Sequence, residues 1–394
     1  MVALFLIFLG IGGANSILGG AWPAISAEIG TPISRQSILI LIVYLSGALG
    51  AVTARSVFSR LRTWIPATSG IIVIAIAIFV FSGAPGFVSM PFSCAALGYF
   101  IGMEAALINS YVTKHYTATA MSWLHCSFAV GCALGPAILS YFITNMDSWR
   151  MGYQANGFLE VGIFVVLLVS FPLWRVHGPV LPSRLPAGPD AQATGSDVKA
   201  KSNLKLLRIP EGAVIPIILL FFCSYESTFF SWATSFLTEE RGMLPGAAAG
   251  MLALFFGGQV AGRIASGFIS LRVSDRILIR VSMIVVFAAT IIFIFAPDNM
   301  MTPIFIVIGV ATGPIFPMLI HEVPSLVGEE NAQGVIGLQL GGANIGNASI
   351  PLLAGEIAGV SGFRIFPVFL IVLIGIALAL KTAQDIRVAK ARRV

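Results

Sequence analysis

Three carboxyl side chains interrupt long apolar stretches of this 394-residue chain. Glu104 lies in GYFIGMEAALINSY (98–111), Glu226 lies in FFCSYESTFFSWATSF (221–236), and Glu160 lies in a third apolar stretch. An ionisable side chain at the centre of a bilayer costs about 2.5–3.5 kcal/mol to insert, so each acid is a candidate functional residue. Such a carboxyl group can carry a proton, and we expect this role for Glu226 or Glu104. The alternative is an acid that joins two helices by hydrogen bonds.

Two further polar side chains are candidates beside these acids. His125, in AMSWLHCSFAVGCALGP (120–136), could shuttle protons, and a neutral histidine satisfied by a neighbouring helix is an equal alternative. Asn109 follows Glu104 by five residues, and at about 100° per residue the two side chains point in different directions. We therefore expect Asn109, a candidate for substrate binding, to face a different partner from Glu104.

Aromatic side chains lie next to Glu226 at helical spacing. Tyr225, Phe229, Trp232 and Phe236 recur at i, i+4, i+7 and i+11. Aromatic faces stack on sugar rings or cations, and tyrosine and tryptophan also have polar tips that need partners. We therefore favour substrate contact for Tyr225 and Trp232. For the phenylalanines, packing against a neighbouring helix is an equal alternative.

Amides are concentrated in AQGVIGLQLGGANIGNASIP (332–351). One helical face of this segment carries Gln333, Gly337, Leu340, Asn344, Asn347 and Pro351. An amide both donates and accepts hydrogen bonds, which suits a neutral polyhydroxy ligand. The alternative is glycine-mediated helix packing, with the amides bonded to neighbouring carbonyls. The expected substrate-binding residues are Gln339, Asn344 and Asn347 in this segment, and Asn15 and Trp22 in the first apolar stretch.

A cation also lies at depth in an apolar segment. Arg263, in GGQVAGRIASG (257–267), could snorkel to the interface or pair with a carboxylate. We favour pairing for Arg263, as a gating residue on the inner side, and snorkelling for the shallower Arg55.

The composition is that of an integral membrane protein. Hydrophobic residues make up 57% of the chain, charged residues make up 10%, and the mean hydropathy is +0.94. A soluble domain has about 25% charged residues. Continuous apolar runs of about 20 residues favour transmembrane helices over a barrel, whose strands alternate. The net charge of +6 comes from basic residues that flank these runs, so we expect no nucleic-acid partner.

Division at proline, glycine and charge clusters predicts twelve transmembrane helices. The predicted spans are 2–24, 36–57, 64–84, 90–112, 119–144, 149–174, 213–237, 246–270, 276–296, 301–325, 331–359 and 362–381. The first residues lack the basic region and cleavage site of a signal peptide, so we interpret them as a retained span. Eighteen of the 23 lysines and arginines then fall in inner loops or the C-terminal tail, which predicts that both termini are cytoplasmic.

The one long polar stretch, residues 175–210, is rich in proline, glycine, alanine and lysine. We interpret it as a flexible cytoplasmic linker. It separates a predicted N-terminal six-helix bundle, 1–174, from a C-terminal one, 211–394.

The two halves show a weak internal repeat. Residues 46–63 align with 257–274 at an offset of 211, and the same offset sets Asn15 opposite Glu226. Parallel six-helix halves predict a transporter that rocks about a site between them.

At this level the chain resembles the major facilitator superfamily, over essentially its whole length. Twelve spans, a central cytoplasmic loop and basic loops after the second and eighth spans are that family's plan. The loop after the second span lacks the family's acid, whereas Asp275 followed by Arg276 keeps it after the eighth span.

Within that superfamily the chain is similar to the fucose:proton symporter type. The similarity lies in LHCSFAVGCALGP, SWRMGY, GGQVAGRIASG, GPIFPMLI and IGLQLGGANIGNASIPLLAG. It implies sugar uptake coupled to a cation. That group has an acid in span 1, where this chain has Asn15. In span 4 that group has an acid followed four residues later by an asparagine, whereas here Asn109 follows Glu104 by five residues.

Two transport functions remain open. The first is proton-coupled (or sodium-coupled) uptake of a sugar or similar small polar solute by alternating access, in the cell membrane and as a monomer. The alternative is export of amphipathic drugs or metabolites, favoured by the aromatic and methionine content. The sequence has no nucleophile–base pair, metal-ligand spacing or phosphate loop, so we expect no enzyme activity, catalytic residue, metal or cofactor.

Overall fold

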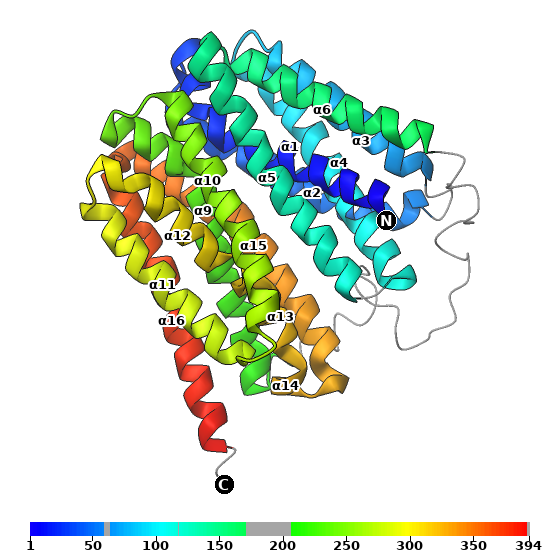
Figure 1. The fold of residues 1–394 in the computed structure, drawn as a ribbon, viewed down its shortest axis with the longest axis vertical. Coiled ribbons are helices and arrows are strands. Elements are labelled where there is room, and N and C mark those ends of the chain that lie inside the picture. Colours follow the sequence, from blue (N-terminus) through cyan, green and yellow to red (C-terminus); the bar gives the residue numbers. More distant parts are fainter. Residues whose placement is uncertain (59–63, 117, 171–205, 392–394) are drawn as a thin grey trace. The chain divides into compact units, whose positions relative to one another are not determined.

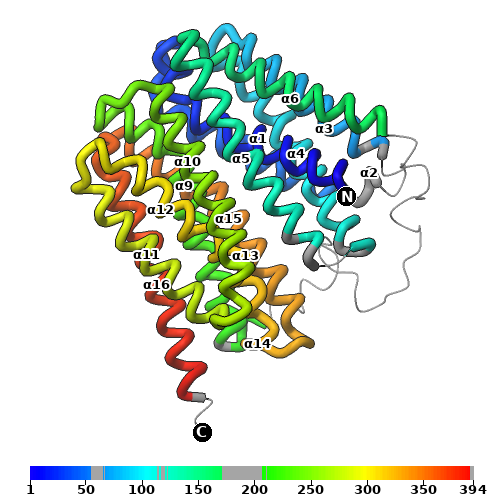
Figure 2. Tube along the Cα trace, viewed as in Figure 1, coloured from blue at the N-terminus to red at the C-terminus, as the bar shows by residue number. Residues whose placement is uncertain are grey.

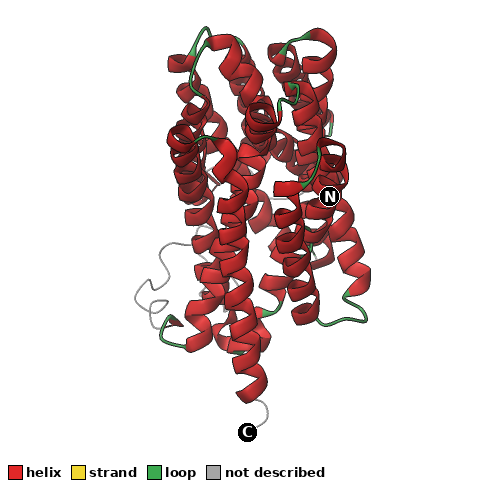
Figure 3. Cartoon of the chain, turned by 90° about the vertical axis from the view of Figure 1, so that its left-hand side faces the viewer, coloured by secondary structure: helices red, strands yellow, loops and turns green. Residues whose placement is uncertain are grey.

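The protein is all-helical in the part of the chain that is described. The structure, a computed structural model, describes residues 1–58, 64–116, 118–170 and 206–391, and these form helices and turns without strands (Figure 1, Figure 3). They divide into two compact units. Met1–Gly195 with Met243–Ala253 is called the N-terminal unit, and Ser196–Gly242 with Leu254–Val394 the C-terminal unit. The predicted all-α fold class is thus confirmed.

Most of the linker predicted at 175–210 lies outside the described residues, as do residues 59–63 of the aligned stretch and the side chain of Arg55.

The N-terminal unit contains six long helices, which agree with the first six predicted spans to within a few residues. They are α1 (Val2–Ile29), α2 (Gln36–Phe58), α3 (Trp64–Ser82), α4 (Met90–His115), α5 (Ala118–Met146) and α6 (Trp149–Val169). The short helices η1 (Ile33–Arg35) and η2 (Phe87–Ser89) precede α2 and α4. The most extensive contacts pair α2 with α4, α1 with α5 and α3 with α6.

The C-terminal unit contains the remaining helices and most of α10. They are α9 (Pro210–Arg241), α10 (Pro245–Ile269), α11 (Asp275–Phe295), η3 (Asp298–Met300), α12 (Met301–Thr312), α13 (Ile315–His321), α14 (Val323–Val327), α15 (Glu329–Ser361), η4 (Phe363–Ile365) and α16 (Phe366–Ala391). Here α9 packs along α15 and α16, and α11 packs on α12 and α16 (Figure 2). The pairing of α9 with α15 repeats that of α1 with α5, and the pairing of α11 with α16 repeats that of α3 with α6.

Ten of these segments are long and apolar enough to cross a membrane. Ala67–Ser82, in the third predicted span, is a shorter apolar helix. The eleventh predicted span is α15, whose 33 residues exceed the roughly 20 needed to cross a bilayer but include many amides and glycines. The ten segments and these two helices are consistent with the twelve predicted spans and indicate an integral membrane protein.

The tenth predicted span, 301–325, is not one continuous helix. Helix α12 ends at Thr312 and α13 begins at Ile315, so Gly313 and Pro314 interrupt the span. Proline has no amide hydrogen and its ring crowds the preceding turn, which bends or breaks a helix. The segment Asp298–His321 is nevertheless long and apolar enough to cross a membrane, in agreement with the predicted span.

Close glycine contacts repeat at the offset of 211 residues. In both units a Cβ at these glycines would press on the backbone of the helix packed alongside. The pairs are Gly98 and Gly309, Gly102 and Gly313, Gly131 and Gly342, and Gly135 and Gly346. The offset found between two short stretches therefore relates four helices of each unit.

An acid–arginine pair also recurs in the two units. Glu28 at the end of α1 accepts a hydrogen bond from Arg150 of α6 at 2.9 Å. Glu240 at the end of α9 accepts one from Arg364 of η4 at 3.1 Å. Each pair joins the first helix of its unit to the start of the last, so both units close one end in the same way.

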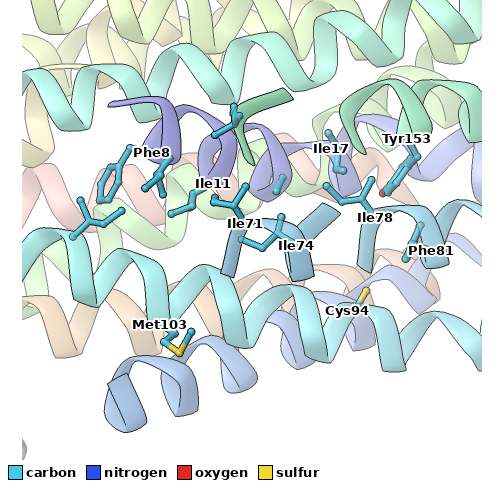
Figure 4. Close-up of a cluster of buried hydrophobic side chains, with 14 of the residues drawn as sticks. Phe8, Ile11, Ile17, Ile71, Ile74, Ile78, Phe81, Cys94, Met103 and Tyr153 are labelled. Carbon is cyan, nitrogen blue, oxygen red and sulfur yellow. The ribbon is translucent and has the colours of Figure 1, made fainter. Parts of the chain in front are cut away.

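The interior of the N-terminal unit is a continuous apolar core. Figure 4 shows Phe8 and Ile11 of α1 close to Ile71 and Ile74 of α3, with Met103 of α4 nearby. A polar side chain in such a core must find a partner or remain uncharged, because an unpaired charge there is very unfavourable.

Candidate functional site

Helices α9 and α10 bring together an acid, an amide and a cation. Gln259 Nε2 donates a hydrogen bond to Glu226 Oε1, and Arg263 interacts electrostatically with the same carboxylate. Gln259 is buried, and the other two side chains are half-buried. We call Glu226, Gln259 and Arg263 the α9–α10 cluster. Glu226 and Arg263, both predicted from the sequence, thus lie together, and the amide between them was not singled out.

The spacing of the cluster follows from helix geometry. Gln259 and Arg263 are four residues apart and therefore share one face of α10. Gly313 lies against this part of α10, because a Cβ at that position would press on the Gln259 carbonyl and the Arg263 amide nitrogen. The break between α12 and α13 consequently lies next to the cluster.

The cluster can act as a charge switch. A half-buried carboxylate is stabilised when it accepts a hydrogen bond and lies near a cation. A proton on Glu226 would cancel the charge and weaken its attraction to Arg263. Binding of a proton would therefore alter the interaction between these side chains of α9 and α10.

The N-terminal unit has no such cluster at the corresponding positions. The offset of 211 sets Asn15, Ala48 and Val52 opposite Glu226, Gln259 and Arg263 respectively. Asn15 is half-buried, and Val52 is 63% exposed. The N-terminal unit therefore has two apolar residues and one amide where the C-terminal unit has the cluster.

Glu104 lies inside the N-terminal unit. Its side chain is fully buried, and neither carboxylate oxygen has a hydrogen-bond partner among the described residues. It occupies the space above Gly70 of α3, where a Cβ would collide with Oε1. The counterpart at the offset of 211 is Ile315, which is also fully buried. Glu104 thus occupies a position that an aliphatic side chain fills in the other unit.

The aromatic candidates on α9, Tyr225 and Trp232, face the interior of their own unit. The Tyr225 hydroxyl is hydrogen-bonded to Thr290 of α11 at 2.8 Å, and Trp232 Nε1 donates to the Pro351 carbonyl of α15 at 2.8 Å. Both side chains are buried. Their polar tips are satisfied by neighbouring helices in this structure, and substrate contact by these two residues stays a prediction.

Trp22 and Gln339, also expected to bind substrate, are buried as well. Trp22 Nε1 donates to the Ile33 carbonyl at 2.7 Å, and its ring meets Phe87 edge-on. Gln339 Nε2 donates to the Leu319 carbonyl at 3.4 Å. Neither side chain exposes surface to a solute in this structure, and substrate binding by these two residues stays a prediction.

The remaining candidates lie on more open helix faces. Asn344 of α15 is exposed, and Asn347 is half-buried. Asn109 of α4 is half-buried. His125 of α5 is exposed, and its ring meets Phe8 of α1 edge-on at a centroid distance of 5.7 Å.

A network of buried charges in the C-terminal unit was missed by the sequence analysis. Lys381 of α16 is fully buried and forms ion pairs with Glu322 and with Asp385, the latter at 3.1 Å. Arg276 and Arg280 of α11 reach Asp385 at 3.2 Å and 2.6 Å. The sequence signal was the i, i+4 spacing of Lys381 with Asp385 and of the two arginines, whereas we counted these cations only as loop charges.

No metal site is evident in this network or elsewhere in the described residues, where no three His, Cys, Asp or Glu side chains are placed to hold an ion.

Comparisons with known proteins agree with this architecture. The family model of the Major Facilitator Superfamily matches residues 4–339 and 237–391. No curated protein matches. Two structures of a bacterial homologue of the human lysosomal transporter Spinster are similar. The inward-facing occupied form has 15% identity, a TM-score of 0.72 and coverage of 98% of this chain and 96% of that one. The unoccupied form has 15% identity, a TM-score of 0.73 and coverage of 97% and 95%.

A structure of the nucleoside transporter NupG is similar at 13% identity, with a TM-score of 0.73 and coverage of 97% of this chain and 98% of that one. At such identities the likeness to these structures concerns the fold, whereas the family match covers most of the sequence. The chain therefore belongs to the Major Facilitator Superfamily, and the protein is a membrane transporter, not an enzyme.

Proposed function

We propose that the protein is a secondary active transporter that takes up a small polar solute, such as a sugar, together with protons by alternating access. The observation that carries this proposal is the α9–α10 cluster, where an acid, an amide and a cation meet inside apolar helices. Ionisable residues in such helices mark ion and substrate pathways in membrane proteins. The counterpart positions of the N-terminal unit do without these charges, which supports a functional role.

Glu226 is the proposed proton carrier, and Arg263 the proposed gating residue. The Glu226 carboxyl group accepts a hydrogen bond from Gln259, and the charge of Arg263 acts on it. When a proton binds, this attraction weakens and α9 and α10 are held less firmly. A ligand shifts a conformational equilibrium by its different affinity for the two states, so the proton favours the state in which this contact is loosened.

A polar, uncharged solute suits the remaining candidate side chains. Asn344 is exposed, Asn15 and Asn347 are half-buried, and each amide can donate to and accept from hydroxyl groups. One of the similar structures is that of a nucleoside transporter. A nucleoside carries a hydroxylated sugar ring, which supports a solute of this chemical class.

Transport into proteoliposomes tests the proposal. Purified protein is given an inward proton gradient and a panel of labelled sugars and nucleosides. We expect Glu226→Gln to keep solute exchange but to lose gradient-driven accumulation. Glu239→Gln, an exposed acid on the same helix, is the matched control and should behave as wild type. Undiminished accumulation by Glu226→Gln would refute the coupling role.

The same system distinguishes the alternatives. A sodium gradient of equal size that drives accumulation would assign coupling to sodium. An exporter of amphipathic compounds would load everted vesicles and leave right-side-out cells unloaded. We further propose that the protein is a monomer in the cell membrane with both termini cytoplasmic, which cysteine labelling near each terminus in intact cells would test.

A further inference from the structure

The two halves of the tenth span are held by different neighbours. Helix α12, the first half, packs against α10 through glycines. A Cβ at Gly258 or Gly262 of α10 would press on the backbone of α12, and a Cβ at Gly309 of α12 would press on the backbone of α10. Gly313, at the break, makes the same kind of contact. The first half is therefore fixed to α10 by close backbone packing.

Helix α13, the second half, is held by charged side chains. Its last residue, His321, lies next to Asp275 at the start of α11, with Nδ1 and Oδ2 2.6 Å apart. Glu322 follows α13 and forms ion pairs with the buried Lys381 of α16 and, at 3.5 Å, with Arg276 of α11. Beyond the break, the span is therefore tied to α11 and α16.

Lys381 has further partners on its own helix. Its Nζ atom lies 3.1 Å from Asp385 and donates a hydrogen bond to Gln384 Oε1 at 3.3 Å. Gln384 in turn donates a hydrogen bond to Glu211 of α9 at 2.9 Å. If Glu322 moves away, the buried ammonium group still has a carboxylate beside it, and the Glu322 carboxylate gains water. The contact between α13 and α16 can therefore open without leaving a buried charge unpaired.

The apolar support at this end of the span is small. Val323, the first residue of α14, belongs to a separate cluster of four buried hydrophobic side chains. The other three are Ile215, Ala332 and Val335. Gly328 then joins α14 to α15 with a φ of 81°, in the left-handed region that favours glycine. Because segments with few buried apolar contacts open at a lower free energy than the rest of a protein, we expect residues 315–327 to be such a segment.

The N-terminal unit has neither the break nor the acid at the corresponding positions. Helix α4, which corresponds to α12 and α13, is continuous. The offset of 211 sets Met103 opposite Pro314 and Tyr111 opposite Glu322. The proline break and the charged contact thus occur together in the C-terminal unit, as expected if the two features act together.

We call the ion pairs of Glu322 with Lys381 and Arg276 the α13 latch. We propose that this latch opens and that α13 and α14 then move about the break at Gly313 and Pro314. Proline has no amide hydrogen to bond across the break, so the break bends more easily than a continuous helix. Glycine packing keeps α12 on α10 during this movement. The tenth span therefore moves in its second half, and the C-terminal unit is not one rigid body.

Hydrogen–deuterium exchange of the purified protein in lipid nanodiscs, measured by mass spectrometry of its peptides, tests the latch. Glu322→Gln removes the charge, keeps the side-chain size and leaves Lys381 paired with Asp385. We expect about tenfold faster exchange in residues 315–327 and unchanged exchange in α12. The matched control is Glu329→Gln, an exposed acid at the start of α15, which should exchange as wild type. Equal acceleration in α12 and α13, or none in either, would overturn the proposal.

A second variant closes the latch without charges. Glu322→Leu combined with Lys381→Met replaces the ion pair by an apolar contact, and Asp385 keeps both arginines of α11. Replacing a buried ion pair by apolar residues is often neutral or stabilising, so exchange in residues 315–327 should be no faster than in wild type. Faster exchange than in wild type would count against the latch. Because Glu226 is not part of the α13 latch, these readouts do not depend on the proposed proton coupling.

Discussion

The side-chain amide of Gln259 donates a hydrogen bond to the Glu226 carboxylate and thereby joins α10 to α9. Arg263, one turn further along α10, acts on the same carboxylate. The amide is bonded to the carboxylate and the charge of Arg263 acts on the same group, so the effects of the three side chains on one another are coupled. In such a network the effect of one substitution depends on the others.

The first prediction concerns this dependence. Arg263→Gln removes the cation that acts on the carboxylate, and we expect it to lower the thermal unfolding temperature of purified protein. Glu226→Gln made in the same chain should restore most of the loss, because no unbalanced charge then remains. The coupling between the two substitutions should be about 0.5–3 kcal/mol, the range for residues in one network. Additive effects would show that the two side chains do not interact.

The positions of most helices follow from the sequence, because their spans are continuous apolar runs bounded by charge, glycine or proline. The internal repeat could also be predicted from the sequence. Four pairs of glycines that allow close helix contact are separated by its offset of 211 residues. Depth in apolar helices indicated Glu226 and Arg263 as candidates. Their proximity was only partly predictable, because it depends on the rotation of α10, which is set by contacts such as that of Gly313.

The partners of several side chains could not be predicted from the sequence of a single helix. Tyr225 and Trp232 found polar partners on α11 and α15, and nothing in the sequence of α9 indicates those partners. Lys381 looked like a tail cation, yet it pairs with Glu322 from another part of the unit as well as with Asp385 on its own helix. Helical spacing identifies which side chains share a face, but the partner of that face is decided by tertiary packing.

A second prediction follows from the burial of Tyr225. Tyr225→Phe removes the hydrogen bond to Thr290 without creating a large cavity, and should lower the free energy of unfolding by about 0.5–1.5 kcal/mol. The apparent KM for the transported solute should stay at the wild-type value, because the hydroxyl contacts another helix. Thr290→Val should have a similar effect on stability, and the double variant should cost little more than either. A raised KM with unchanged stability would instead indicate that Tyr225 contacts the substrate.

The third prediction concerns the glycine contacts of α10. A side chain at Gly262 would collide with the Val310 carbonyl of α12, whereas Gly267 on the same helix faces open space. Gly262→Val should therefore separate α10 from α12 and leave little folded protein, since overpacking of a close contact is strongly destabilising. Gly267→Val, the matched control, should yield normal amounts. Size-exclusion chromatography of detergent extracts measures both, and a normal profile for Gly262→Val would contradict the close contact.

The last prediction concerns the buried network around Lys381. Lys381→Met keeps much of the side-chain volume but leaves the carboxylates of Glu322 and Asp385 with less positive charge inside the unit. Breaking a buried ion pair by removing one partner costs about 3–5 kcal/mol, and Arg276 and Arg280 should reduce this loss because they also reach Asp385.

The matched control is Arg387→Gln, on the same helix. Arg387 is 48% exposed and pairs with Glu211 at 3.5 Å, and such exposed pairs contribute about 0–1 kcal/mol. In detergent, the thermal unfolding temperature of Lys381→Met should therefore be well below those of Arg387→Gln and wild type. Equal unfolding temperatures for the two variants would mean that the charge of Lys381 does not stabilise the C-terminal unit. A triple substitution of Lys381, Glu322 and Asp385 by apolar residues should recover stability if the loss comes from the unbalanced acids.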